Sequence, residues 1–276
     1  MIAGFSIAAL AGLTIGLLIT GAIAGVLAGL LGVGGGIVIV PVLIVFAEIF
    51  DVPRDVAMLT VVGTSLATII PTSMSSARAH RRKGSIDTGI LRGWVVAIFL
   101  GALAGGFASR VFGSDGLTIV FGVVALAVSV NLALPRTMQL APAPPASAAG
   151  RAAIAAPIGF TSALMGIGGG TLSVPVMTML SVPVHRAVGT ASVFGLAIAV
   201  PAVVGFVWAG WGVEGRPPGS LGFVNLPAAV VLFSTSVLTA PFGATLAHKL
   251  DARKLKLAFA GFLFLSGLRM LWKALA

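Results

Sequence analysis

The chain has 276 residues, of which 58% are hydrophobic and only 9% are charged, and its mean hydropathy is +1.13. These values exclude an ordinary soluble domain and indicate a multi-spanning integral membrane protein that needs a lipid bilayer. The net charge of +10 is also found in nucleic-acid binders, but few charges here lie outside short loops, so we attribute it to orientation in the membrane and expect no nucleic-acid partner.

The first apolar segment, residues 6–31, is long enough to cross a bilayer, and a glycine run separates it from a second segment, residues 37–50. Successive glycines weaken a helix by about 1 kcal/mol each relative to alanine. Free backbone groups at membrane depth are tolerated only where protein buries them or a water-filled cavity satisfies them. We predict a binding site at this break, in either a re-entrant hairpin or a turn between two full spans. Its glycines are Gly32, Gly34, Gly35 and Gly36.

Three further spans are predicted in the first half, at residues 56–79, 88–112 and 116–134. The loop between the first two of these carries Arg78, His80, Arg81, Arg82 and Lys83, and it is the strongest cytoplasmic marker in this half. We assign no special role to His80. The four tryptophans lie near segment ends, where we expect them to form interfacial belts; they are Trp94, Trp208, Trp211 and Trp272.

A proline-rich, non-helical linker separates the halves. Beyond it, segments 152–165 and 171–182 are shorter than the roughly 20 residues that a spanning helix needs, so we predict a re-entrant hairpin. Three spans follow, at residues 186–210, 222–247 and 254–275. The glycines at the tip of this second hairpin are Gly166, Gly168, Gly169 and Gly170.

The two halves are related in sequence. A shift of 134 residues superposes the glycine runs and aligns Pro41 with Pro175, and a shift of 130 aligns Thr60 with Thr190. The changing offset is typical of a duplicated unit with small insertions and deletions in its loops. We therefore divide the chain into a first transmembrane repeat at residues 1–134, a cytoplasmic linker at 135–151 and a second repeat at 152–276.

The charges predict that the repeats are inverted relative to each other. The basic loop of the second half comes one span later than that of the first, with Lys249, Arg253, Lys254 and Lys256. Arg269 and Lys273 near the C-terminus would then lie outside, which counts against this topology. The predicted fold is an all-α membrane protein with two inverted-topology repeats, each a re-entrant or broken-helix hairpin plus three transmembrane helices.

Inverted glycine tips would direct the helices that start near Gly36 and Gly170 at a shared central point. Helix N-termini present unpaired N–H groups and positive dipole ends, and this geometry favours an anion. Hydroxyl groups nearby are candidate donors, although small and hydroxyl residues also serve simply to pack transmembrane helices closely. The candidate substrate-binding hydroxyls are Thr171, Ser173, Thr60, Thr64, Ser65, Thr190 and Ser192.

The sequence disfavours other kinds of site. No Asp or Glu falls in the middle of a predicted span, which removes the usual cation site and proton relay. No nucleophile, base and orienting group and no metal-ligand spacing occur together, so we expect no catalytic residues, no metal, no cofactor and no enzyme activity. The glycine run at Gly32 resembles a dinucleotide loop, but no strand-like segment precedes it.

The doubled pattern G-L-L-G-V-G-G-G-x-x-x-V-P at Gly29 to Pro41 and M-G-I-G-G-G-x-x-x-V-P at Met165 to Pro175 resembles the TauE/SafE sulfite exporter family over essentially the whole chain. The family's Thr-Ser element after the first loop matches either Thr60 or Thr64 with Ser65, and the repeat alignment favours Thr60. The resemblance implies a carrier of sulfite or small sulfonates in the cytoplasmic (inner) membrane, most often an exporter.

Other functions stay open. The carried anion could be sulfoacetate, thiosulfate or a carboxylate, because helix N-termini recognise negative charge before they recognise sulfur. An anion channel and a membrane scaffold without transport are further alternatives. The sequence predicts neither the oligomeric state, nor the coupling ion, nor the direction of transport.

Overall fold

The computed structural model describes residues 7–134, 139–247 and 252–275. The described part of the chain is helical apart from loops and a two-stranded antiparallel ribbon, as an all-α membrane protein requires. The elements in order are α1 (Ile7–Leu31), α2 (Gly36–Ile49), α3 (Arg54–Arg82), α4 (Thr88–Ala133), α5 (Ala148–Met165), α6 (Gly170–Met179), α7 (Val184–Ala209), β1 (Ser220–Leu221), β2 (Val224–Asn225), α8 (Leu226–Leu246) and α9 (Ala252–Leu275).

Six of the described helices are long and apolar enough to cross a membrane: α1, α3, α4, α5, α7 and α8. In α3, 83% of the most apolar stretch is buried within the protein, against 28% in α1 and 33% in α8. Helix α3 is therefore a central helix, whereas α1 and α8 turn much of their surface toward the lipid.

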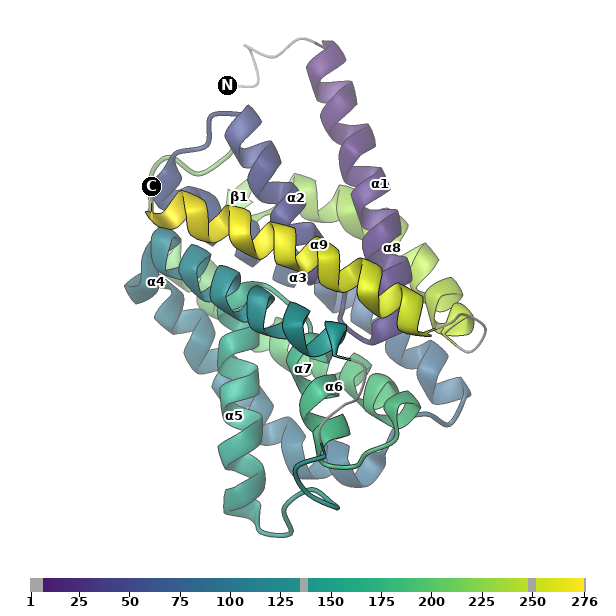
Figure 1. The fold of residues 1–276 in the computed structure, drawn as a ribbon. Coiled ribbons are helices and arrows are strands. Elements are labelled where there is room, and N and C mark those ends of the chain that lie inside the picture. Colours follow the sequence, from purple (N-terminus) through teal and green to yellow (C-terminus); the bar gives the residue numbers. More distant parts are fainter. Residues whose placement is uncertain (1–6, 135–138, 248–251, 276) are drawn as a thin grey trace.

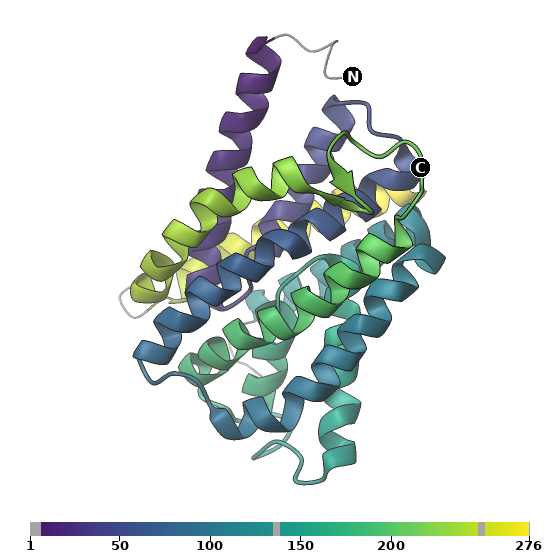
Figure 2. The same ribbon diagram turned by 180° about the vertical axis from the view of Figure 1, so that it is seen from behind.

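The helices follow a symmetric order. Seen from behind, α8, α3, α7 and the first part of α4 lie side by side (Figure 2), α1 packs on α8, and α5 packs on α4. Exchanging α1 with α5, α3 with α7 and α4 with α8 reproduces the same order. Figure 1 shows that α1 runs inward from one end of the molecule and α5 from the opposite end, so that the glycine turns that follow them meet near the middle.

Glycines on α1 allow this close packing. Gly21, Gly25 and Gly29, spaced by one helical turn, lie directly against backbone carbonyl groups of α8 at Leu232, Ser236 and Ala240, where a Cβ atom would overlap the oxygen. Glycines on α4 pack in the same way against α5, at Gly101 and Gly105. Such small-residue contacts replace the hydrophobic effect as the source of helix association in lipid.

Helix α4 includes two of the predicted spans. The backbone at Gly113 is not helical, with φ 64° and ψ −175°, and this break separates the predicted spans 88–112 and 116–134. A positive φ is accessible to glycine at little cost, and Gly113 can therefore turn the chain without a loop.

The first turns of α4 and α8 are capped alike. Asp87 accepts hydrogen bonds from the N–H groups of Gly89 and Ile90 at 3.0 Å, and Asn225 accepts one from Ala228 at 3.0 Å. These caps satisfy N–H groups that have no partner within the helix. They fix the ends at which both helices begin.

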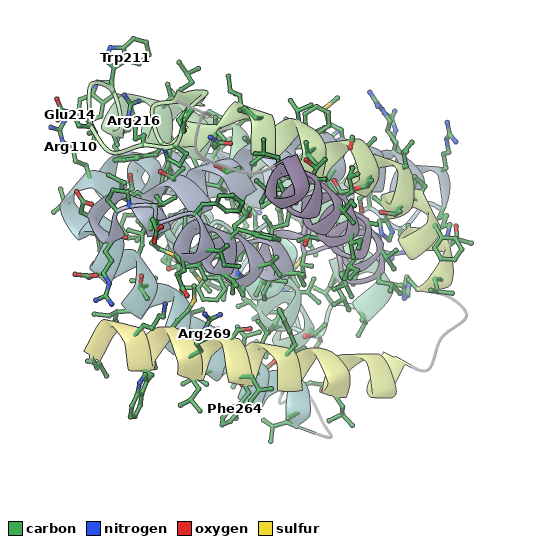
Figure 3. All side chains as sticks on the ribbon, turned by 90° about the horizontal axis from the view of Figure 1, so that it is seen from above. Arg110, Trp211, Glu214, Arg216, Phe264 and Arg269 are labelled. Carbon is green, nitrogen blue, oxygen red and sulfur yellow. The ribbon has the colours of Figure 1, made fainter. Side chains whose placement is uncertain are left out.

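Basic residues are concentrated at one end of the molecule, where α3 ends and α4, α5 and α7 begin. The positive-inside rule predicts that this end faces the cytoplasm. The opposite end is balanced: among the described residues it carries Arg54, Arg110, Arg216, Arg269 and Lys273 together with Glu48, Asp51, Asp55, Asp115 and Glu214, several of which are labelled in Figure 3.

Arg269 and Lys273, which counted against this topology, have a partner at that balanced end. In Figure 3 the side chain of Arg269 points from α9 toward the other helices, whereas Phe264 points away from them. Arg269 donates a hydrogen bond to Glu48 at 2.9 Å, and Lys273 also forms an ion pair with Glu48. Glu48 therefore offsets part of the positive charge at the C-terminal end of α9.

Candidate functional site

The two glycine loops contact each other directly. The N–H group of Gly168 donates a hydrogen bond to the carbonyl oxygen of Val33 at 3.1 Å. A Cβ atom at Gly36 would overlap the carbonyl oxygen of Gly166, and one at Gly170 would overlap the backbone of Gly32. The first residue of each inner helix, α2 or α6, thus lies against the opposite loop.

The backbone of the first loop depends on glycine. Gly34 and Gly35 have φ values of 69° and 81°, and a Cβ atom at Gly35 would in addition lie 2.8 Å from the carbonyl oxygen of Ala24. Other residues adopt such φ values only at a cost. The consecutive glycines therefore permit both the turn and the close approach of the two chains.

Neither inner helix has a side-chain cap. Gly35 precedes α2 and Gly169 precedes α6, and neither supplies a capping hydrogen bond, in contrast to Asp87 at α4 and Asn225 at α8. The first N–H groups of a helix have no intrahelical partner, and they carry the positive end of the helix dipole. The two helices that begin at the buried tips are thus without the side-chain oxygens that would compete with an anion.

Each loop also packs on the long central helix of the other half. Gly32 lies against the backbone of Val188 in α7, and Gly166 lies against the backbone of Val62 in α3. The hydroxyl of Ser65 donates a hydrogen bond to the carbonyl oxygen of Gly166 at 2.7 Å. A movement of either loop would therefore disturb its contacts with the central helix of the opposite half.

The structure decides between the two matches for the Thr-Ser element. Thr64 accepts a hydrogen bond from the N–H of Asn225 at 2.9 Å, and Thr190 accepts one from Asp87 at 2.9 Å. Since Asn225 and Asp87 hold equivalent capping positions, Thr64 is the counterpart of Thr190. The repeat alignment favoured Thr60, which lies one helical turn away, and was wrong at this point.

Several predicted hydroxyls bond to their own helix. Ser173 donates to the carbonyl oxygen of Gly169, and Ser192 donates to Gly189 at 2.6 Å. Both are buried, so their hydrogen bonds keep polar groups satisfied in an apolar interior. Thr171 and Thr60 differ, because neither hydroxyl has a hydrogen-bond partner among the described residues.

Unpaired polar side chains lie near the two loops. Thr171 follows Gly170, and Ser162 precedes the loop on α5, where its carbonyl oxygen accepts the N–H of Ile167 at 3.1 Å. Ser73 of α3 faces Gly34 of the first loop and Gly195 of α7. In the described part of the chain, buried polar atoms without a partner include Thr171 Oγ1, Ser162 Oγ, Ser73 Oγ and Trp94 Nε1.

Trp94 is not part of an interfacial belt. It is fully buried, with 0% exposure, whereas Trp208, Trp211 and Trp272 are 57% or more exposed. Its ring stacks on Phe194 with centroids 6.3 Å apart and planes 6° from parallel. The expectation of a belt was wrong for Trp94, because a position near the start of a helix does not reveal which face the neighbouring helices cover.

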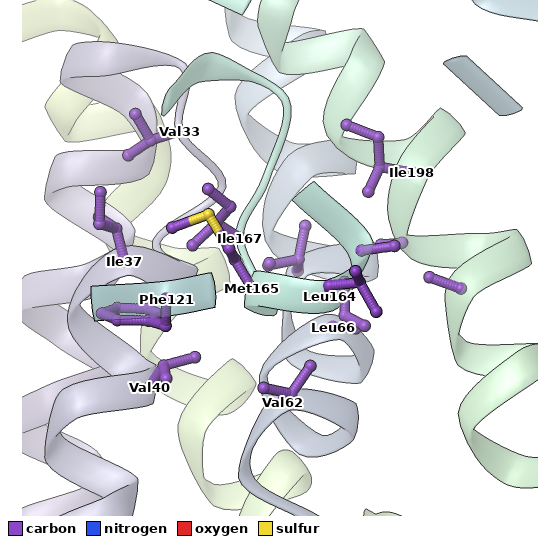
Figure 4. Close-up of a cluster of buried hydrophobic side chains, with 14 of the residues drawn as sticks. Val33, Ile37, Val40, Val62, Leu66, Phe121, Leu164, Met165, Ile167 and Ile198 are labelled. Atoms are coloured by element: carbon purple, nitrogen blue, oxygen red, sulfur yellow. The ribbon is translucent and has the colours of Figure 1, made fainter. Parts of the chain in front are cut away.

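The loops lie among apolar side chains. Figure 4 shows Val33, Ile37, Met165 and Ile167 from the two hairpins packed together with α3 at Val62. In such a low-dielectric environment a hydrogen bond to an anion is stronger than in water, and an unpaired polar group is more costly. Buried polar atoms without a partner in this region therefore need an explanation.

Comparison with known proteins gives the same assignment as the glycine motifs. The sequence profile of the sulfite exporter TauE/SafE family matches residues 17–270. The chain belongs to the TauE/SafE family. It is accordingly a multi-pass transporter of the cytoplasmic membrane.

Curated members of the TauE/SafE family are similar over most of the chain. A probable membrane transporter protein of Haemophilus influenzae is 33% identical over 265 residues, covering 93% of this chain and 97% of the relative. One from Methanocaldococcus jannaschii is 27% identical over 92% of this chain and 94% of the relative. The Bacillus subtilis protein YunE is 33% identical over 59% of this chain and 67% of its own length. No solved structure matches this chain.

This TauE/SafE protein has a cavity of about 120 Å³ between its helices. It is mostly apolar and is lined by α1, α2, α3 and the start of α8, including Thr60, Thr64 and Asn225. The hydroxyl of Thr60, 5% exposed and without a described partner, belongs to this lining. The glycines of the two loops do not line it.

Beyond the cavity, α3 carries a buried polar ridge, formed by polar side chains at every fourth residue, that the sequence did not predict. Thr64, Thr68 and Thr72 each donate to the carbonyl oxygen four residues earlier, and Thr72 also pairs with Ser236 of α8 at 2.5 Å. The ridge ends at His80, which is 2% exposed and bonds through Nε2 to the carbonyl oxygen of Gly29 at 3.0 Å. His80 is thus a buried residue that joins α3 to α1, and the expectation that it has no special role was wrong.

Proposed function

We propose that this chain is a secondary or facilitated carrier of sulfite or a small organosulfur anion, and that the anion binds where the two glycine loops meet. The observation that carries the proposal is the contact between the loops: two uncapped helix N-termini converge there, and buried hydroxyls without partners surround them. Free N–H donors, a positive dipole end and the close approach that glycine permits are the elements of an anion site.

The proposed mechanism is alternating access. Residues 1–134 and 152–276 act as two inverted repeats joined by the cytoplasmic linker 135–151, of which residues 135–138 lie outside the described part. The opposite entry directions of α1 and α5 and the matching helix order support this arrangement. In the described state the tips are closed on each other, so the anion enters when the loops part, first toward one side and then toward the other.

The contacts at the cytoplasmic end support a difference between the two sides. Asp87 at the start of α4 and Arg186 at the start of α7 form an ion pair at 3.6 Å between the two halves. At the other end the counterpart of Asp87 is the neutral Asn225, which lines the cavity. An ion pair this exposed contributes little stability, about 0–1 kcal/mol, and can open during transport. We therefore propose that the described state is closed toward the cytoplasm and more open on the other side.

The test is transport by purified protein in liposomes. We expect ³⁵S-sulfite flux to saturate with concentration and to be driven by unlabelled sulfite on the opposite side, as a carrier requires. Flux that does not saturate and shows no counterflow would indicate an anion channel. Counterflow with thiosulfate, sulfoacetate or a carboxylate but not with sulfite would keep the carrier and change the substrate. If none of these anions crosses, the proposal is wrong.

A further inference from the structure

We propose that Trp94 is a substrate-contacting residue, whose indole N–H donates a hydrogen bond to the anion held at the second glycine loop. This inference rests on the proposed function and adds helix α4 to the site. The sequence places Trp94 seven residues after the Asp87 cap and gives no sign of this role.

The position of Trp94 relative to the loop follows from two contacts. Its ring stacks on the ring of Phe194. A Cβ atom added at Gly169 would lie 2.6 Å from the Cβ atom of Phe194. Trp94 is thus separated from the loop by one side chain. The next residue of α7, Gly195, faces the unpaired hydroxyl of Ser73.

Packing explains the ring of Trp94 but not its nitrogen. A phenylalanine would stack on Phe194 equally well and would bury no polar atom. The indole Nε1–H can only donate a hydrogen bond, whereas a hydroxyl can either donate or accept one. Buried donors are almost always paired in proteins, and this one has no partner in the part of the chain that the structure describes. An acceptor that is absent from the protein itself, such as an oxyanion, satisfies it.

The other unpaired groups favour the same occupant. Ser73, Ser162 and Thr171 are 3% exposed or less, and each is a hydroxyl that can donate. They come from α3, α5 and α6, and Ser73 lies beside Gly34 of the first loop, so four helices including α4 carry unpaired donors near the two touching loops. An oxyanion has several acceptor atoms and can use donors that arrive from different directions. We infer that the site binds a small anion with several hydrogen-bond acceptor atoms.

Three of these groups, Thr171, Ser162 and Trp94, have no polar counterpart in the other repeat. Their counterparts in the repeat alignment are apolar: Ile37 matches Thr171, Ala28 matches Ser162, and Leu232 matches Trp94. Duplication alone would have given equal chemistry to both loops. These three donors therefore occur in one repeat position only, while the hydroxyl of Ser73 lies beside Gly34 of the first loop.

Trp94→Phe tests the inference, because it keeps the aromatic stack and removes only the N–H. The matched control is Trp208→Phe in α7, where the ring is 57% exposed. We expect Trp94→Phe to raise the KM for sulfite flux roughly tenfold or more, as loss of a hydrogen bond to a charged group does, and the control to leave it unchanged. An unchanged KM in Trp94→Phe, with normal wild-type flux, would overturn the role of Trp94 and leave the proposed carrier function standing.

Thermal unfolding separates substrate contact from packing. If Trp94 only packs, Trp94→Phe lowers the Tm without ligand and leaves the sulfite-induced rise in Tm intact. If its N–H serves the anion, the unliganded Tm stays the same or rises, since a buried unpaired donor is removed, and the sulfite-induced rise shrinks. The first pattern would contradict the proposal and the second supports it.

A fluorescence titration gives a readout that does not depend on transport. Replacing Trp208, Trp211 and Trp272 by Phe leaves Trp94 as the single indole of the chain. Sulfite, thiosulfate, methanesulfonate and acetate are then added in turn to the purified variant. We expect at least one of them to change the emission of Trp94 saturably. If none does, the inference is wrong, whether or not the wild-type protein transports sulfite.

Discussion

The N–H of Gly168 donates to the carbonyl oxygen of Val33 at 3.1 Å, and this hydrogen bond joins two hairpins whose glycine runs are 134 residues apart in the sequence. A Cβ atom at Gly168 would overlap that same oxygen. The contact therefore requires glycine, although the φ of Gly168 is not positive. The contact between Gly168 and Val33 is made by backbone atoms alone, and in the proposed mechanism its N–H group becomes available to a ligand only when the loops part.

Gly168→Ala should destabilise the protein by about 1–3 kcal/mol, because the added methyl group forces the two loops apart in a close-packed interior. Gly12→Ala on α1 is the matched control, since a Cβ atom there meets nothing within 4 Å. Unfolding of the detergent-solubilised proteins by heat or denaturant measures the difference. Equal stability of the two variants would show that the loops do not touch.

Ser65→Ala should cost about 1 kcal/mol, since it removes the hydrogen bond to Gly166 that ties α3 to the second loop. Ser234→Ala removes a local bond to Val231 on the exposed face of α8 and should be nearly neutral. The same unfolding assay compares them. A larger effect at Ser234 would contradict the assignment of Ser65 as a contact between the halves.

Thr64→Val and Thr190→Val should destabilise by similar amounts, about 1–3 kcal/mol each, because each leaves the N–H of a capping residue, Asn225 or Asp87, without its acceptor. Thr60→Val removes a hydroxyl with no described partner and should be much milder. If Thr60→Val proves the most harmful of the three, the equivalence of Thr64 with Thr190 is wrong.

The absence of cysteine from the chain makes the topology easy to test, because any single introduced cysteine is the only thiol. We predict that a membrane-impermeant maleimide labels Glu214→Cys in intact cells and labels Arg82→Cys only after the membrane is permeabilised. The reverse pattern would place the basic end of the molecule outside.

The sequence was sufficient for the class and for most of the spans. These predictions rest on the lengths of the apolar segments and on the repeated glycine run, and both signals are local in the chain. The sequence was wrong for segment 152–165, which was predicted to be too short to cross, because α5 (Ala148–Met165) begins four residues earlier and is long and apolar enough to span a membrane. The re-entrant nature of the two hairpins stays a prediction.

The break at Gly113, which separates the last two spans of the first half, fell between predicted segments. Residues 139–147 of the linker lack a helix, as predicted, and Leu140 bonds to the end of α6 at Met179. The prediction was wrong for residues 148–151, which form the first turn of α5.

The side-chain donors could be predicted only in part. Thr171 was identified because it adjoins the glycine run, whereas Ser73, Ser162 and Trp94 lie on other helices and come near the loops only through tertiary packing. Serines and threonines that bond to their own helix look the same in sequence as those that lack a partner. The difference depends on which neighbour covers each hydroxyl, and a single sequence does not contain that information.

The most direct test of the anion site is Thr171→Val measured in the sulfite flux assay. Thr171 is 3% exposed, lies in the first turn of α6 and has no described partner for its hydroxyl, whereas Thr178 in the same helix donates to Pro175 at 2.8 Å. We predict that Thr171→Val raises the KM for sulfite roughly tenfold at unchanged thermal stability, and that Thr178→Val does not. An unchanged KM in a folded Thr171→Val protein would contradict binding at the second glycine loop.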